Sequence, residues 1–188
     1  RDKYYQALEL RPLRQGPARP VKGLPKKPRL AALHWSPDGK RVAFAHVAPS
    51  GSELWVAGSD SRISRYKHMA EHLGVGSRIR FLGGITDMLP LYGAVDAAVL
   101  PSLYEPFGTA VLEGMACGLP VAVSSDCGAA EAVSRYDPRL IAETGSVDAL
   151  AGAIRRAFDH ASDASAKVSV RSVAESYGLD TMVDRMLD

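Results

Sequence analysis

From residue 54 to the end of the chain, short apolar segments alternate with longer amphipathic ones. The apolar segments have the length of strands, and the segments between them carry apolar residues at helical spacing. Repeated strand–helix–strand units connect parallel neighbours through right-handed crossovers. The pattern therefore predicts an α/β fold with a Rossmann-like parallel sheet, whose strands are expected at residues 54–58, 79–83, 97–101, 120–124 and 140–143. Helices are expected between these strands, among them one that begins at Thr86 or Asp87 and buries Tyr92, and one over residues 108–117. Two more, at 147–160 and 167–187, close the fold.

The first 53 residues follow a different pattern. Residues 1–30 are rich in proline, arginine and lysine, and are expected to be irregular apart from a short helix over residues 4–10. Residues 31–53 alternate as strands do, and the run Ser36-Pro37-Asp38-Gly39-Lys40 has the composition of a hairpin turn. We therefore expect three parts: a basic leader (1–30), a short β-meander (31–53) and an α/β domain (54–188).

Charge divides the chain in the same region. Residues 1–42 hold eleven basic and three acidic residues, a net charge of +8, whereas residues 43–188 carry −6. Contact with an anionic membrane surface or an acidic partner is one interpretation of the basic head, and a solvated, flexible leader is the other. The head lacks the interleaved aromatic residues of a nucleic-acid stacking surface, so no nucleic-acid partner is expected.

The cysteines and histidines give no sign of a disulfide framework or a metal site. Cys117 and Cys127 make a poor disulfide framework for this length, and Cys127, in a loop, is expected to be partly exposed. No residues have metal-ligand spacing, so no metal site is expected.

No apolar run approaches the roughly 20 residues that span a bilayer. The expected location is the cytoplasm, with contact at the inner face of a membrane as an additional interpretation.

The candidate site lies in the run from Glu105 to Glu113, where a strand gives way to a helix. In an open parallel sheet this corner is where ligands bind. The first turn of the helix has free N–H groups and the positive end of the helix dipole, which suit a phosphate. Gly108 has no side chain, so a ligand could approach the backbone closely. Carboxylates repel phosphate, so the two glutamates are expected to accept hydrogen bonds from hydroxyl groups on either side of it.

Residues 100–121 resemble the donor-site signature of family 4 retaining glycosyltransferases. They contain two glutamates separated by seven residues, then a helix of small residues and the strand entry Gly118-Leu119-Pro120-Val121. The resemblance implies a GT-B fold, of which residues 54–188 would be the C-terminal, donor-binding domain. It also implies that Glu105, the candidate catalytic residue, contacts the transferred sugar and that Glu113 holds the ribose hydroxyls. The sugar and diphosphate would lie against the backbone of Phe107, Gly108 and Thr109.

The same resemblance implies further properties of the site. Gly84 and Ile85 would lie near the nucleotide base, although packing in the core explains Ile85 equally well. Transfer would be retaining and metal-independent, with a nucleotide diphosphate sugar as donor substrate and no cofactor. The acceptor, a glycan or a lipid-linked molecule, would bind through an N-terminal domain that this chain lacks. The first βα unit, with the basic residues that neutralise the diphosphate, is also missing, so the chain alone is expected to be weak or inactive.

A second resemblance covers residues 1–56. The run 34–44, followed by Glu53-Leu54-Trp55-Val56, resembles one blade of the β-propeller of prolyl-oligopeptidase-like serine peptidases. A propeller needs several blades, and no Gly-x-Ser-x-Gly motif is present to carry peptidase activity. The sequence is therefore interpreted as a chimera or fragment. The alternative function is a non-catalytic interaction module whose working part is the blade-like head, or a β-propeller fragment of a serine-peptidase-like protein.

Overall fold

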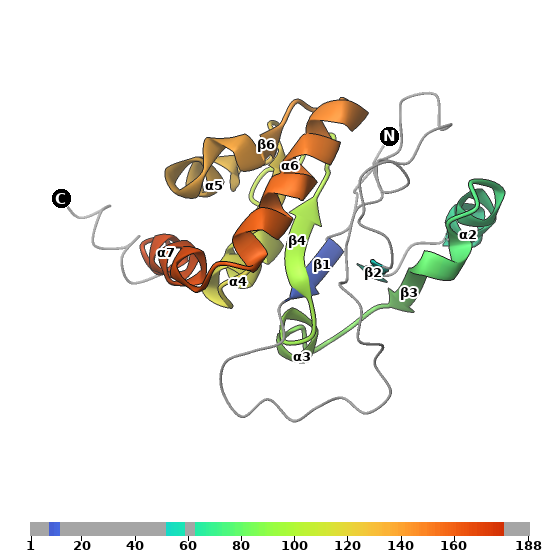
Figure 1. Cartoon of the computed structure of the whole chain (residues 1–188), viewed down its shortest axis with the longest axis horizontal. Coiled ribbons are helices and arrows are strands. Elements are labelled where there is room, and N and C mark those ends of the chain that lie inside the picture. The colour runs from blue at the N-terminus through green and yellow to red at the C-terminus, as the bar shows by residue number, and fades with distance from the viewer. Residues whose placement is uncertain (1–7, 12–51, 59–62, 179–188) are drawn as a thin grey trace.

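The computed structural model describes residues 8–11, 52–58 and 63–178 and places six strands in one sheet. The order across the sheet is β3-β2-β1-β4-β5-β6, and Figure 1 shows β1 between β2 and β4. The strands are β1 (Leu8–Arg11), β2 (Leu54–Ala57), β3 (Ile79–Gly83), β4 (Asp96–Leu100), β5 (Val121–Ser124) and β6 (Ile141–Ala142). The expected meander, apart from residues 52 and 53, lies outside the described residues.

Helices connect and cover the strands. They are α2 (Ile63–His72), α3 (Leu89–Tyr92), α4 (Thr109–Ala116), α5 (Ala130–Tyr136), α6 (Val147–Ala161) and α7 (Ala164–Glu175). Two short 3-10 turns, η1 (Gly76–Arg78) and η2 (Pro138–Leu140), precede β3 and β6. Helix α6 crosses in front of β4 (Figure 1) and packs on β4, β5 and β6, while α7 packs against α4, α5 and α6.

The predicted α/β fold with a parallel sheet is confirmed. Strand β2 runs parallel to β3, β4 to β5, and β5 to β6. All four residues of β5 are buried, as expected of a strand covered on both faces. Because β1 is antiparallel to both β2 and β4, those two strands also point the same way. The carboxyl ends of β2 through β6 therefore meet at one edge of the sheet.

Strand β1 departs from the prediction. The sequence pattern predicts an irregular leader with a short helix over residues 4–10, and for residues 8–11 this is wrong. They form an antiparallel strand between β2 and β4, with Leu8 opposite both Val56 and Val99. Strands β2 and β4 would otherwise each leave a row of backbone N–H and C=O groups unpaired. Backbone pairing depends little on side-chain type, so a segment with weak strand composition can occupy this position.

Two helices are shorter than the sequence pattern predicts. The helix expected to begin at Thr86 or Asp87 is a single turn, α3, in which the Leu89 N–H donates to Asp87 Oδ1 at 3.1 Å. It ends at Tyr92, four residues before β4 begins at Asp96. The last helix, α7, ends at Glu175 rather than continuing to 187, and the predicted remainder beyond residue 178 lies outside the described residues.

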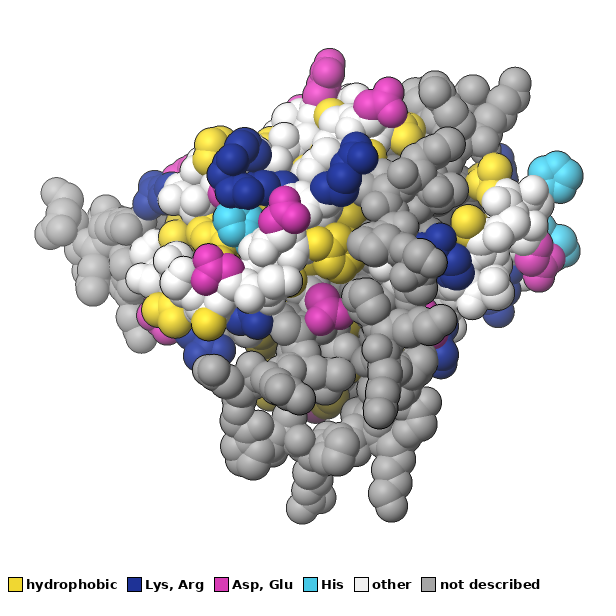
Figure 2. All heavy atoms as spheres, viewed as in Figure 1, with side chains coloured by type: hydrophobic (Ala, Val, Ile, Leu, Met, Phe, Trp, Pro, Cys, Tyr) yellow, Lys and Arg dark blue, Asp and Glu magenta, His cyan; other side chains and the backbone are white. Residues whose placement is uncertain are grey.

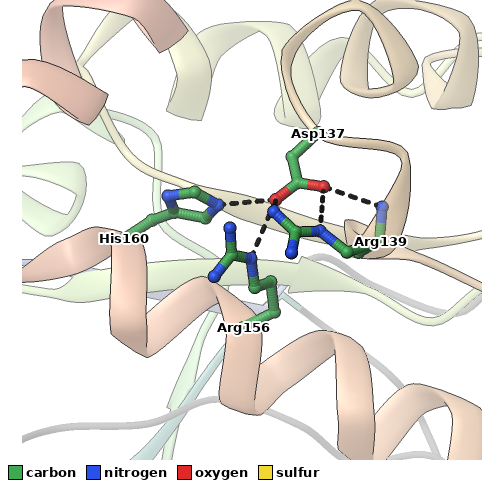
Figure 3. Close-up of polar contacts among 4 residues, drawn as sticks. All are labelled: Asp137, Arg139, Arg156 and His160. Atoms are coloured by element: carbon green, nitrogen blue, oxygen red, sulfur yellow. Dashed lines mark hydrogen bonds and ion pairs between the residues drawn. The ribbon is translucent and has the colours of Figure 1, made fainter.

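A buried carboxylate ties the η2 turn to α6. Asp137 is 4% exposed and accepts hydrogen bonds from Arg139, Arg156 and His160, at 2.9, 2.9 and 2.7 Å (Figure 3). Figure 2 shows Lys and Arg side chains gathered beside a histidine over α5 and α6. Burial alone would raise the pKa of Asp137, but the hydrogen bonds from Arg139, His160 and Arg156 outweigh it and hold that pKa well below its usual range. Asp137 is therefore ionised and fixes α6 relative to the end of α5.

Candidate functional site

The loop after β4 contains most of the predicted site residues. It joins β4 to α4 at the edge of the sheet where the parallel strands end, and the loop after β5 lies against it. The Glu105 N–H donates to the Asp126 carbonyl at 3.0 Å, and the Gly128 N–H donates to the Glu105 carbonyl at 2.8 Å. Ser124, at the end of β5, donates its hydroxyl to the Ser102 carbonyl. The two loops are thus joined through their backbones.

Glycines at two positions allow this close contact. Gly108 has φ of +77°, and a Cβ there would lie 2.8 Å from Cys127 Sγ and 3.1 Å from Ala129 Cβ. At Gly128 a Cβ would lie only 2.1 Å from the Pro106 carbonyl oxygen. The prediction that Cys127 is partly exposed is wrong: it is 3% exposed, and burial raises the pKa of its thiol. Cys127 is covered because the β4–α4 loop folds over it.

Glu105 lies in the loop four residues before α4 begins at Thr109. Its Oε1 accepts hydrogen bonds from the N–H groups of Phe107, at 3.3 Å, and Gly108, at 3.1 Å. These are two of the backbone groups expected to contact the sugar and diphosphate. The Glu105 carboxylate thus binds the backbone directly before α4, near the positive end of the helix dipole.

The other residues predicted in this loop lie at its surface. Phe107 is 56% exposed, and Thr109, the first residue of α4, is also exposed. Tyr104, on the other side of Glu105, is 67% exposed. The loop thus offers aromatic surface on both sides of a half-buried glutamate.

Glu113 lies one turn into α4, and its carboxylate is held by a residue that the sequence pattern places in the core. Tyr92, the last residue of α3, is 3% exposed and donates its hydroxyl to Glu113 Oε2 at 2.6 Å. The Tyr92 oxygen also lies 3.3 Å from the Ala110 carbonyl oxygen. The sequence pattern predicts the buried ring but not its polar contact. A signal was available, because a buried tyrosine hydroxyl usually has a hydrogen-bond partner.

Gly84 and Ile85 follow β3 and are not brought next to Glu105. Strand β3 is separated from β4 by β2 and β1, so the two loops start about 14 Å apart, at about 4.8 Å per strand. Gly84 is exposed, and Ile85 is half-buried against the hydrophobic core. A ligand that contacts both loops must therefore lie extended along the sheet edge.

The described part of the chain offers neither a metal site nor a membrane-spanning helix. Among its residues, no group of three histidines, cysteines, aspartates or glutamates is arranged to bind a metal ion. Within the same residues, no helix has both the length and the apolar character needed to cross a membrane.

Comparison with solved structures identifies the class of fold. Sucrose-phosphate synthase from Thermosynechococcus elongatus superposes with a TM-score of 0.72 and 26% identity, covering 90% of this chain and 46% of that one. WaaG, a glycosyltransferase involved in lipopolysaccharide biosynthesis, superposes with a TM-score of 0.60 and 27% identity, covering 72% and 36%. The sheet and its helices are those of a GT-B glycosyltransferase domain.

Sequence comparison identifies the family. The model of the glycosyl transferases group 1 family matches residues 43–169, and this chain belongs to that family. An uncharacterized glycosyltransferase of Methanocaldococcus jannaschii is 39% identical over 84 residues, which are 44% of this chain and 22% of the relative. The 2-deoxystreptamine N-acetyl-D-glucosaminyltransferase of Streptomyces fradiae is 32% identical over 145 residues, 73% of this chain and 34% of the relative. The chain thus spans about a quarter to a third of these relatives.

The family match overlaps the segment that resembles a propeller blade. The match begins at residue 43, upstream of the domain boundary expected at residue 54. Part of the segment that resembles a propeller blade therefore also matches the glycosyltransferase family. The resemblance to a peptidase blade remains a prediction, because most of its residues lie outside the described part of the chain.

Proposed function

We propose that this chain carries the donor-binding half of a nucleotide-sugar-dependent glycosyltransferase. The observation that supports this most directly is the corner after β4, where a half-buried Glu105, a left-handed Gly108 and the start of α4 lie together. Corners of this kind bind ligands in open α/β sheets. Membership of the glycosyl transferases group 1 family favours a nucleotide diphosphate sugar as that ligand.

In this proposal, different parts of the donor contact different predicted residues. The diphosphate and sugar would approach the N–H groups at the start of α4, where the helix dipole favours negative charge. Glu113 lies about 6 Å further along the helix axis than Thr109 and would accept hydrogen bonds from the ribose hydroxyls. Gly84 and Ile85 would lie beside the base. Because Glu105 already accepts from Phe107 and Gly108, the donor must displace its carboxylate from these groups before its own oxygens can bind there.

The proposed reaction is retaining and metal-independent. The bond between the anomeric carbon and the diphosphate breaks, and the acceptor oxygen bonds to the same carbon on the same face. The acceptor proton passes to an oxygen of the leaving diphosphate, so no cofactor is needed. Hydrogen-bond donors and the dipole at the start of α4 would stabilise the charge that develops on the diphosphate. Glu105 is assigned to positioning the sugar beside that bond.

The acceptor half lies outside this chain in the proposal. A glycan or lipid-linked acceptor would bind a separate N-terminal domain, and a lipid carrier would bring the enzyme to the inner face of a membrane. The diphosphate would also lack the basic residues of the first βα unit. Each missing charge-assisted hydrogen bond weakens binding by roughly 1.5–3 kcal/mol. We therefore expect weak donor binding and no measurable sugar transfer by the 188-residue chain.

A thermal-shift panel tests the proposal. UDP, GDP, ADP and their glucose conjugates are added to the wild type, to Glu113→Ala and to Glu175→Ala, an exposed glutamate of α7. We expect one nucleotide to raise the Tm of the wild type and of Glu175→Ala but not that of Glu113→Ala. Cooperative melting with no response to any of the ligands would contradict the proposal.

A further inference from the structure

The contact between Tyr92 and Glu113 brings together two elements that are distant in the sequence. Tyr92 ends α3, and Glu113 lies on α4, twenty-one residues later. The Tyr92 ring is buried beside Gly114, where a Cβ would lie 3.6 Å from the ring carbon Cε1. Packing thus fixes the ring, and the ring places its hydroxyl against the Glu113 carboxylate.

This contact restricts a side chain that would otherwise be mobile. Glu113 is exposed on the surface of α4, where a glutamate can adopt several rotamers. The 2.6 Å hydrogen bond from a buried phenol engages Oε2. Oε1 accepts no hydrogen bond from any of the residues that the structure describes, so it is available to a ligand. The carboxylate is therefore held in one orientation before any ligand arrives.

We propose that Tyr92 is a positioning residue that makes the site selective for the hydroxyls of the ribose. The inference rests on the proposed function, in which Glu113 binds these hydroxyls. A fixed carboxylate accepts from a ribose hydroxyl without further loss of rotamer entropy. A ligand without the hydroxyl leaves that carboxylate unpaired and binds less well. If the carboxylate were free to rotate into water, this discrimination would be smaller.

Tyr92→Phe tests the inference, because it removes the hydroxyl and keeps the ring. Binding of UDP, GDP and ADP and of their 2′,3′-dideoxy analogues is measured by isothermal titration calorimetry on the full chain. For the nucleotide that binds, we expect Tyr92→Phe to weaken the ribonucleotide about five- to twentyfold and to change the dideoxy analogue less than twofold. The Tm without ligand should fall by only a few degrees, which shows that the variant is folded.

Tyr177→Phe is the matched control. Tyr177 lies two residues after α7 and donates its hydroxyl to Glu131 of α5 at 3.0 Å. Removing this hydroxyl should change the affinity for neither nucleotide. In the background of Glu113→Ala, Tyr92→Phe should have no further effect, because the carboxylate that it positions is gone.

The outcomes separate the inference from the proposed function. Binding by the wild type that Glu113→Ala abolishes but Tyr92→Phe leaves unchanged would overturn the inference alone. Equal weakening of the ribonucleotide and the dideoxy analogue would also overturn it, because the hydroxyl would then act on the fold and not on ribose recognition. Failure of the wild type to bind any of the nucleotides would overturn the proposed function and this inference with it.

Discussion

At the scale of single residues, glycines decide whether the site can form. Gly108 combines a positive φ with a position where a side chain would collide with Cys127 and Ala129. Its role at the start of α4 could be predicted from the sequence, because a ligand-binding corner requires close approach to the backbone. Its contact with the loop after β5 could not, because that contact depends on how two loops pack across neighbouring strands.

Replacement of Gly108 by alanine is expected to destabilise the protein. Left-handed backbone costs about 1–2 kcal/mol with a Cβ, and overpacking adds about 1–3 kcal/mol, so the free energy of unfolding should fall by roughly 2–5 kcal/mol. Urea denaturation measures the change. Gly152→Ala, on α6 with no heavy atom within 4 Å of the added Cβ, is the control and should be neutral or stabilising. Equal stability of the two variants would show that the two loops are not packed as described.

At the scale of elements, charge and capping set the positions of the helices. Ser146 and Asp163 accept backbone hydrogen bonds at the starts of α6 and α7, and Asp137 links η2 to α6. The sequence pattern predicts the strand at residues 79–83 with the bounds that the structure shows, and predicts α4 and α6 to within one or two residues. These bounds follow from the spacing of the apolar residues. The partners of Asp137 lie up to 23 residues away, and no periodicity indicates them.

Removing the charge of Asp137 should loosen α6. Asp137→Asn leaves the cations without a buried carboxylate, and the free energy of unfolding should fall by about 3–5 kcal/mol at pH 7. Chemical denaturation of the variant and of Asp159→Asn, an exposed position on α6, measures the difference. An effect of Asp137→Asn no larger than that of Asp159→Asn would contradict the assignment of Asp137 as the link.

The lowered pKa of Asp137 predicts that the stability of the protein depends on pH. The native pKa of Asp137 lies below its ordinary value of 3.8, so the unfolded chain takes up the proton first as the pH falls. The stabilisation by Asp137 is therefore fully present above about pH 5 and decreases progressively as the pH falls below about 4. The free energies of unfolding of the wild type and of Asp137→Asn should accordingly become equal in acid. A stability difference that stays constant between pH 7 and pH 3 would contradict this.

At the scale of the whole molecule, β1 holds the sheet together. Among the described strands, β2 and β3 form one parallel group and β4, β5 and β6 another, and β1 pairs with both groups. The resemblance implies that the first βα unit upstream of residue 54 is missing, but the sequence does not indicate that residues 8–11 pair between β2 and β4. The leader is poor in strand-forming residues, so its composition does not predict the strand that it forms between β2 and β4.

Deletion of residues 1–12 should separate the two groups of strands. The unpaired edges of β2 and β4 should then lower the Tm or lead to self-association. Deletion of residues 1–7, which keeps β1, is the matched control and should melt and remain dispersed like the full chain. Melting curves and size-exclusion chromatography with light scattering compare the three proteins. Identical behaviour of both truncated chains would contradict a structural role for β1.

The central claim is that a nucleotide sugar binds at the corner between β4 and α4. An amide NMR titration with UDP-, GDP- and ADP-glucose locates binding residue by residue. We predict that one ligand shifts the amide signals of Phe107, Gly108 and Thr109 most, with smaller shifts at Gly84 and Ile85. Saturable shifts confined to other parts of the chain, or no shifts at millimolar ligand, would contradict the claim.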